Sequence, residues 1–160
     1  MLLRKGAIIH KVPHSIDRFH AAMIEPLSCG AYAAELADIK MRDTVVVSGL
    51  GAIGLAALQF AKLYNPYRLI AFGATDKSLE LALSLGADFA VDVRKETMHD
   101  ELRQLTNSLG CDKYIECSGA AVAVATGIDV LRKRGRMVVY GVYSRNAVID
   151  ANNIGQNQEL

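Results

Sequence analysis

The stretch over residues 44–55, TVVVSGLGAIGL, constrains the fold of this chain more than any other part of it. Its first half is a run of β-branched residues, which is typical of a strand buried on both faces. Its second half has the spacing GxGxxG and leads into a helical pattern. The chain is therefore expected to pass from a buried strand through a tight turn directly into a helix.

The three glycines of this turn have separate tasks. Gly49 lets the chain leave the strand sharply, Gly51 lets backbone approach a pyrophosphate, and Gly54 lets the helix pack closely on the strand. The free N–H groups at the helix start, at Ala52 and Ile53, then face the phosphates. A turn that merely contains small residues is the plain alternative, but the flanking strand and helix favour a dinucleotide-binding site.

Apolar runs of strand length alternate with helical patterns over the rest of the chain. Strands are expected near 44–48, 68–72, 88–92, 112–116 and 136–141, and helices near 52–64, 76–85, 97–109 and 119–133. In the third of these helices Met98, Leu102, Leu105 and Leu109 share one face, and Thr97 with Asp100 resembles a capping pair. The alternation implies right-handed crossovers and a parallel sheet covered on both faces, which is the doubly wound α/β (Rossmann) architecture.

Both ends of the chain lie outside this alternation. Residues 7–12 read as a short strand, and residues 17–38 as mostly helical. The tail, 146–160, is polar and stops where a sixth strand would begin, so the sheet is expected to lack its last edge strand. The predicted parts are an N-terminal part with a junction helix over 1–38, a dinucleotide-binding domain over 39–145 and a truncated tail over 146–160.

Composition narrows the class of protein. With 160 residues and 51% hydrophobic content, the chain is long and apolar enough for one domain with a two-sided core. The net charge is +1 and the charges are mixed, which argues against nucleic-acid and membrane partners. No signal peptide or membrane-spanning stretch is visible, so a cytoplasmic protein is expected. Cys111 and Cys117 lie about 20 Å apart along one strand, too far for a disulfide, and reduced thiols are expected.

Five segments, taken in order, resemble the zinc-dependent medium-chain alcohol dehydrogenases, and most closely their polyol (sorbitol- or threitol-type) branch. They are Ile24-Glu25-Pro26-Leu27, the turn over 49–54, the stretch over 79–88, Glu116-Cys117-Ser118-Gly119, and the stretch over 135–141. The resemblance covers residues 8–145, and the combined order is far more specific than any single motif.

The resemblance implies reversible oxidation of a small alcohol or polyol to a ketone or aldehyde with NAD or NADP, in a homo-oligomer. Family members also carry a preceding catalytic domain with a cysteine, a Gly-His-Glu motif and often four clustered structural cysteines, none of which occurs in this sequence. Residues 1–38 then correspond to a remnant of that domain. Zinc is expected only in a full-length family enzyme, no metal site is complete here, and this chain alone is expected to be inactive.

By the same resemblance, Glu25 is a zinc ligand or a partner of the zinc-bound water. A carboxylate near a helix start, favoured by the helix dipole, is an equally good reading. Cys29 matches a position near the nicotinamide, although a small buried residue is the better description. The four histidines, His10, His14, His20 and His99, show no ligand spacing and are given no role; His20 is expected at the surface.

Two segments are expected at the carboxyl ends of strands, where open α/β sheets bind ligands. Cys117, Ser118 and Gly119 follow the fourth strand and are predicted to contact the cofactor. Gly141, Val142 and Tyr143 close the fifth strand and match the family segment that passes the nicotinamide ribose. Glu116 is interpreted as a structural carboxylate with satisfied hydrogen bonds.

Cofactor specificity depends on the end of the second strand. In the family register, the acidic residue that bonds the adenosine ribose falls at Gly73, so no carboxylate repels a 2′-phosphate there. Lys77 or Arg68 is available to neutralise that phosphate. Asp76 is an alternative carboxylate, interpreted first as a helix N-cap or first-turn residue. NADP is therefore favoured over NAD.

Two other classes of protein remain open. A methyltransferase also uses a glycine-rich first turn, but it usually has an acidic residue where this chain has Ser48, and another at the end of the second strand. A non-enzymatic regulatory domain that binds NAD(P) needs only the fingerprint. The Glu25 segment and the polyol-type motifs argue against it.

Overall fold

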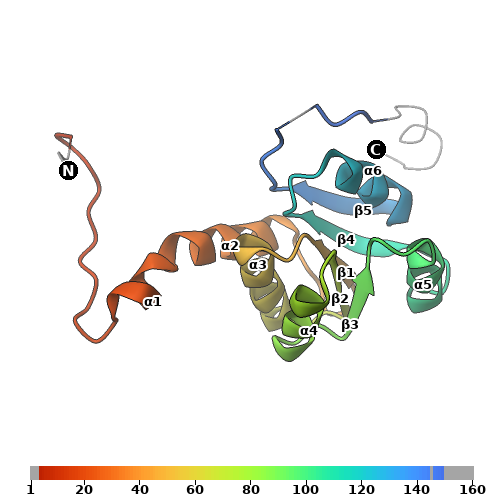
Figure 1. Cartoon of the computed structure of the whole chain (residues 1–160), viewed down its shortest axis with the longest axis horizontal. Helices are drawn as coiled ribbons and strands as arrows, with labels where there is room; N and C mark the ends of the chain where they lie inside the picture. Colours follow the sequence, from red (N-terminus) through yellow and green to blue (C-terminus); the bar gives the residue numbers. More distant parts are fainter. Residues whose placement is uncertain (1–3, 145, 150–160) are drawn as a thin grey trace.

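Five parallel strands form one sheet at the centre of the structure (Figure 1). The computed structural model describes residues 4–144 and 146–149. The strands are β1 (Thr44–Ser48), β2 (Arg68–Gly73), β3 (Phe89–Asp92), β4 (Cys111–Glu116) and β5 (Leu131–Val139). Their spatial order is β3-β2-β1-β4-β5, so the chain winds outward in both directions from β1. The predicted doubly wound α/β architecture is confirmed.

Helices cover both faces of this sheet. They are α1 (Arg18–Ala22), α2 (Ile24–Leu36), α3 (Ala52–Leu63), α4 (Asp76–Ser84), α5 (Met98–Leu105) and α6 (Ala121–Val130). One hydrophobic cluster joins α2, α3 and α4 to the sheet, and the other joins α5 and α6 to its opposite face. Alternate side chains of β1 enter the two clusters, with Val45 and Val47 in the first and Val46 in the second. The central strand is therefore buried on both sides and holds its carboxyl end rigidly.

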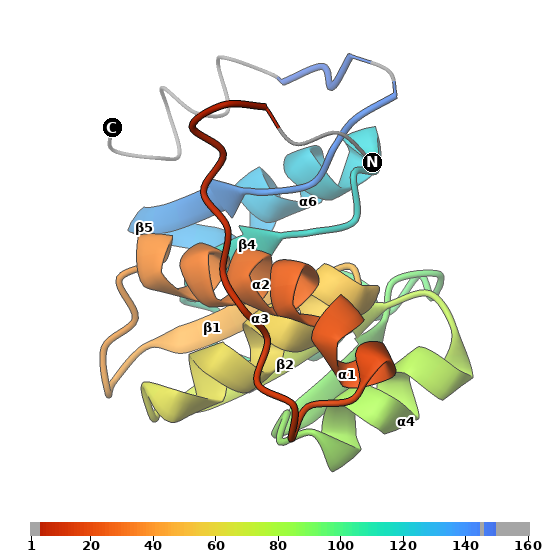
Figure 2. The same ribbon diagram turned by 90° about the vertical axis from the view of Figure 1, so that its left-hand side faces the viewer.

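The segment expected to be mostly helical over 17–38 forms two helices, the short α1 and the longer α2. Asp17 caps α1 by accepting hydrogen bonds from the backbone N–H groups of Phe19 and His20, at 2.8 and 3.1 Å. The longer α2 packs on α3, where Gly30 permits close contact because a Cβ there would lie 2.5 Å from the Cβ of Ala56. The prediction of a short strand over 7–12 is wrong, since that segment is exposed and pairs with no strand of the described chain (Figure 2).

The second half of the chain also differs in detail from expectation. The helix expected over 97–109 ends at Leu105, and Leu109 is 73% exposed rather than part of the apolar face. Thr97 does not form the expected pair with Asp100; its hydroxyl donates to Glu101 at 2.7 Å instead.

The last helix and strand, expected over 119–133 and 136–141, are both displaced. Helix α6 ends at Val130, and β5 begins at the next residue. Leu131 lies opposite Cys111, and Arg136 lies opposite Lys113. The register therefore shifts between these two pairs, and the spacing of apolar residues in the sequence does not indicate this shift. Pairing ends near Tyr140, because the N–H groups of Tyr140 and Gly141 both donate to the carbonyl of Glu116, at 2.8 and 3.0 Å.

Among the described helices, none has both the length and the apolar character needed to cross a bilayer. All three cysteines are free thiols.

Candidate functional site

The turn after β1 brings the chain to the carboxyl edge of the sheet in the way the glycines predict. Gly49 has φ +90°, in the left-handed region, and a Cβ there would lie 2.5 Å from the backbone nitrogen of Ser118. Its N–H donates to the carbonyl of Phe72 at 3.0 Å, which ties the turn to the end of β2. Gly54 is equally constrained, because a Cβ there would lie 1.7 Å from the carbonyl oxygen of Gly49. Both glycines serve close packing.

Gly51 differs from its two neighbours in the motif. It has an ordinary extended backbone, and a Cβ there would meet no atom within 4 Å. It is also the N-cap of α3, and no side chain caps that helix. The N–H groups of the first turn, at Ala52, Ile53 and Gly54, lack intrahelical acceptors because every α-helix leaves its first donors unpaired. Open space therefore lies in front of a positively polarised helix end.

A pocket of about 390 Å³ lies beside this turn, at the carboxyl edge of the sheet. Its walls are largely apolar and include Leu50, Phe72, Val93, Met98 and Val122. Gly73, Thr75 and Ser78 line one side, and Ser118 lines another. An apolar slot with a few polar groups at its rim is suited to a flat heterocycle that carries a ribose.

The ends of β4 and β5 are joined by one buried carboxylate. Glu116 is fully buried, and its Oε1 accepts from the backbone N–H of Ser118 at 2.7 Å. The hydroxyls of Ser118 and Tyr143 also donate to this carboxylate. A Cβ on Gly119 would lie 2.3 Å from the carbonyl oxygen of Val142, so the two segments are in direct contact. The interpretation of Glu116 as a satisfied structural carboxylate is confirmed by these contacts.

A tyrosine and a cysteine in this corner have raised pKa values. Burial, and then the hydrogen bond to the Glu116 carboxylate, raise the pKa of Tyr143. Burial, with a smaller effect of the same carboxylate, raises the pKa of Cys117 to about 12. The phenol and the thiol are therefore protonated at neutral pH, and neither is poised as a base or nucleophile.

The first turns of α2 border the same corner. Cys29 is half-buried rather than fully buried, and its thiol donates to Glu25 Oε1 at 3.3 Å. A hydrogen bond with the Cys29 thiol, and secondly burial, raise the pKa of Tyr140. Glu25 is itself exposed, so its carboxylate faces solvent.

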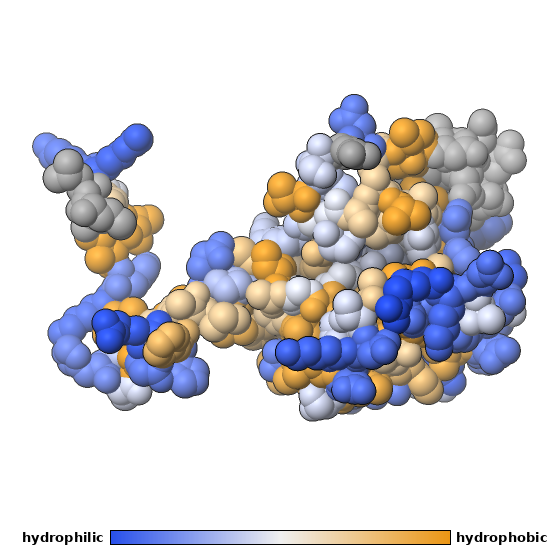
Figure 3. Space-filling view, viewed as in Figure 1, coloured by the Kyte–Doolittle hydropathy of each residue, from blue (hydrophilic) through white to orange (hydrophobic). Residues whose placement is uncertain are grey.

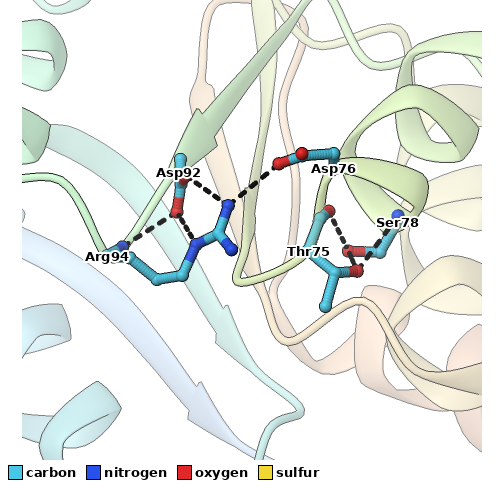
Figure 4. A network of polar contacts seen from close by, with 5 residues as sticks. All are labelled: Thr75, Asp76, Ser78, Asp92 and Arg94. Carbon is cyan, nitrogen blue, oxygen red and sulfur yellow. Dashed lines mark hydrogen bonds and ion pairs between the residues drawn. The ribbon is translucent and has the colours of Figure 1, made fainter.

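An ion-pair network occupies the other end of the site, beside Gly73. Figure 4 shows the guanidinium of Arg94 between the carboxylates of Asp92 and Asp76. The Arg94 side chain donates to Asp92 from Nε at 2.8 Å and from Nη2 at 2.7 Å, and to Asp76 from Nη2 at 2.9 Å. Hydrogen bonds from Arg94 lower the pKa of Asp92 to about 2. The sequence analysis assigns no role to Asp92 or Arg94, although Asp92 ends the third predicted strand and Arg94 lies two residues further along the chain.

The start of α4 completes this end of the site. Thr75 is the N-cap and accepts from the N–H of Ser78 at 3.3 Å, which leaves Asp76 in the first turn, as expected. Lys77 follows and is exposed. Arg68 does not belong to the site, because it begins β2 whereas Gly73 ends it, about 16 Å away along the strand. Its guanidinium carbon lies 4.9 Å from the centre of the Tyr67 ring.

No group of three or more histidine, cysteine or acidic side chains suited to a metal ion occurs among the described residues. Glu25 and the Cys29 thiol make two possible ligands where a zinc site needs about three, so the described residues do not fit a zinc ion.

Comparison with known proteins is consistent with this geometry. Residues 52–159 match the family model of zinc-binding dehydrogenases. The chain is 41% identical over 160 residues to an erythritol/L-threitol dehydrogenase of Mycolicibacterium smegmatis, which covers 100% of this chain and 44% of that protein. It is 37% identical over 138 residues to a sorbitol dehydrogenase of Halalkalibacterium halodurans, which covers 86% of this chain and 40% of that protein. The chain thus spans less than half the length of these relatives.

Solved structures of dehydrogenases also superpose on this chain, again over less than half of their own length. An oxidoreductase of unknown specificity from Escherichia coli superposes with a TM-score of 0.85 at 28% identity, over 92% of this chain and 42% of that one. A protein of Sinorhizobium meliloti assigned to the zinc-binding dehydrogenases, bound to NADP, gives 0.78 at 29% identity, over 89% and 43%. An alcohol dehydrogenase of Escherichia coli in complex with NADH gives 0.80 at 26% identity, over 91% and 43%.

Proposed function

The chain belongs to the zinc-binding dehydrogenase family, and from this premise we propose that it binds a nicotinamide dinucleotide as the cofactor half of an alcohol or polyol dehydrogenase. The polyol dehydrogenases among its relatives support a small polyhydroxy alcohol as the substrate of the whole protein. In that reaction the bound dinucleotide supplies the acceptor for the hydride that leaves the alcohol carbon.

The open space in front of Gly51 is the observation that carries this proposal. The other two glycines of the motif are required by packing, but nothing in the described fold requires a glycine at position 51. A pyrophosphate bound at the start of α3 explains why position 51 is a glycine. Without a side chain at this position, the phosphate oxygens can come close enough to accept from the free N–H groups of Ala52 and Ile53.

The remaining contacts divide between the two halves of the dinucleotide. We assign the adenosine to the apolar pocket beside Gly73 and the nicotinamide to the corner formed by Cys117, Ser118 and Gly119 and by Gly141, Val142 and Tyr143. Glu116 acts as a positioning residue there, since its carboxylate accepts hydrogen bonds from Ser118 in one segment and from Tyr143 in the other. The protonated thiol and phenol keep charge away from the reacting ring.

We further propose that NADP is preferred over NAD. Gly73 ends β2 without a carboxylate, so the position that would repel a 2′-phosphate is neutral. Lys77 adds an exposed positive charge one residue into α4. Structural relatives are known with each cofactor, NADP in one and NADH in another, so the preference rests on these residues.

Titration calorimetry of the chain with NADPH, NADH and S-adenosylmethionine tests the proposed function. Gly51→Val is expected to weaken dinucleotide binding by at least about a hundredfold, since it blocks charge-assisted hydrogen bonds worth roughly 1.5–3 kcal/mol each. The variant should still fold, because its side chain enters open space, and its loss of stability should be limited to about 1 kcal/mol for the poorer N-cap.

Gln59→Val, at an exposed position of the same helix, is the matched control and should bind as the parent does. Binding of the dinucleotide by Gly51→Val at the parent's affinity would show that the pyrophosphate site is misplaced. Binding of S-adenosylmethionine instead of a dinucleotide would favour the methyltransferase alternative.

A further inference from the structure

We propose that Arg94 binds the 2′-phosphate of NADP, and that Asp76 is the counter-ion which the phosphate displaces. This inference rests on the proposed function, since it concerns the adenosine end of the same dinucleotide site. It transfers to Arg94 the role that the sequence had suggested for Lys77 or Arg68.

The sheet places Arg94 beside the ribose position. Gly73, at the end of β2, lies in register with Asp92, at the end of β3. The N–H of Val93 donates to the carbonyl of Gly73 at 3.0 Å, so the two strand ends stay together for one residue more. Gly73 and Val93 both line the apolar pocket, and Arg94 is the next residue of the chain after Val93. A ribose that enters next to Gly73 therefore meets the Arg94 side chain.

Asp92 fixes the orientation of that side chain. Its carboxylate is only 10% exposed and receives both Nε and Nη2 of Arg94, a bidentate arrangement that holds the guanidinium plane. The backbone N–H of Arg94 also donates to Asp92 Oδ1, at 2.9 Å. The arginine is thus held ready at one place instead of sampling solvent, which lowers the entropy lost when it binds an anion.

Asp76 is a much weaker partner. Its side chain is 85% exposed and takes a single contact from Arg94, through Nη2. Exposed ion pairs of this kind contribute little to stability. The contacts received by the two aspartates use Nε and Nη2, so they leave Nη1 to a phosphate oxygen. A dianionic phosphate is a stronger acceptor than one exposed carboxylate and can take its place.

The surroundings suit a phosphate rather than a pair of ribose hydroxyls. The Thr75 hydroxyl donates to Ser78 Oγ at 2.9 Å, and both belong to the first turn of α4 (Figure 4). A Cβ on Gly73 would lie 3.2 Å from Ser78 Oγ, so the Ser78 hydroxyl lies close to the end of β2. In the competing reading Asp76 accepts the ribose hydroxyls and the site prefers NAD. The two readings predict opposite effects of removing the Asp76 charge.

Affinities for 2′,5′-ADP and 5′-AMP isolate the phosphate contribution, and NADPH and NADH repeat the comparison with whole cofactors. Arg94→Gln should weaken 2′,5′-ADP and NADPH by about tenfold to a hundredfold, as expected for the loss of a charged hydrogen-bonding partner, and leave 5′-AMP and NADH unchanged. Arg103→Gln removes another exposed arginine that is paired with an aspartate, on α5, and should change none of the four affinities.

Asp76→Asn is the second arm and leaves the Arg94–Asp92 pair intact. It should strengthen NADPH binding about two- to fivefold, by removal of the exposed competitor, without changing NADH. Weaker NADH binding in Asp76→Asn would instead support the reading in which Asp76 holds the ribose.

The outcomes separate the two proposals. If Arg94→Gln weakens NADH as much as NADPH, or if only Lys77→Gln lowers the affinity for 2′,5′-ADP, the assignment of Arg94 is overturned while dinucleotide binding stands. A parent chain that binds NADH and NADPH equally, with no response to Arg94→Gln, overturns it as well. Failure of the parent chain to bind either cofactor removes the proposed function, and this inference with it.

Discussion

At the scale of single residues, the glycines of the site differ in how much space surrounds them. The same substitution, such as glycine by valine, therefore has different effects at different positions. Gly49 and Gly54 are needed to bring backbone into contact, and any side chain there must move the turn. Gly51 has open space before it. At Gly73 the space is bordered by flexible groups, with Leu50 Cδ1 2.7 Å and Leu79 Cδ2 3.0 Å from an added Cβ. A side chain can therefore be introduced at Gly73 if the ends of these two leucine side chains move.

Gly73→Asp tests the origin of the cofactor preference. The new carboxylate would lie near the ribose hydroxyls, where it accepts hydrogen bonds from NAD and repels a 2′-phosphate. We expect the ratio of NADPH to NADH affinity to fall by about tenfold or more, the effect of one lost or opposed charge contact. Gly73→Asn adds a side chain of the same size without the charge and serves as the control in calorimetry. An unchanged ratio in Gly73→Asp would mean that position 73 does not face the ribose.

At the scale of helices and strands, the regular elements could be predicted from the sequence. The spacing of apolar residues that distinguishes a strand from a helix can be read within each segment, without knowledge of its partners. The positions of β1, β2 and α3 follow from the valines over 45–47, from the apolar run over 69–72 and from the GxGxxG spacing. The contacts that depend on distant segments could not be predicted. The Arg94–Asp92–Asp76 network needs the register of β2 with β3, and the role of Gly30 needs the packing of α2 on α3. The expected strand over 7–12 failed for the same reason, since a strand depends on a partner that the segment itself does not reveal.

The outer edge of β5 is the element-scale feature with a consequence for assembly. Within the described residues β5 pairs on one side only, with β4, and an open edge offers unpaired backbone groups to another chain. We expect either self-association through this edge or its protection by the chain's own segment after residue 145. Val139→Lys, at a position 53% exposed on β5, should weaken self-association by about tenfold or more, because a charge on an edge strand opposes pairing.

Light scattering over a range of concentrations measures this effect, and Leu63→Lys, at a 78% exposed position on α3, is the control. A monomeric parent whose tail shows slow amide exchange would identify the second arrangement. Monomeric behaviour with rapid exchange along the tail contradicts both.

At the scale of the whole molecule, the N-terminal segment and α1 extend away from the sheet and bear exposed apolar groups. Ile8 and Phe19 are each 87% exposed, and Ile9 is 66% exposed. Hydrophobic surface is visible along this projecting part in Figure 3. Clustered exposed apolar residues are typical of a surface that contacts another protein part. Since the curated relatives are more than twice as long as the region they share with this chain, a further domain is the partner that we expect there.

For the whole molecule we expect that the chain binds the cofactor but does not catalyse the oxidation of an alcohol. Catalytic zinc needs about three protein ligands around an open position, where it polarises the alcohol oxygen. The described residues bring no such group together, and Glu25 stands beside a single thiol. We therefore expect the 160-residue chain to bind NADPH but to hold less than a tenth of an equivalent of zinc, and to reduce neither NAD nor NADP with sorbitol, threitol or simple secondary alcohols.

Metal analysis of protein purified without chelator, paired with absorbance assays in the presence of added zinc, measures both properties. Glu25→Gln should leave NADPH affinity unchanged, because Glu25 is an exposed carboxylate on α2 and is not among the residues assigned to the dinucleotide. One equivalent of zinc with measurable turnover would require a complete metal site within this chain, and the assignment of its catalytic half to another domain would then be wrong.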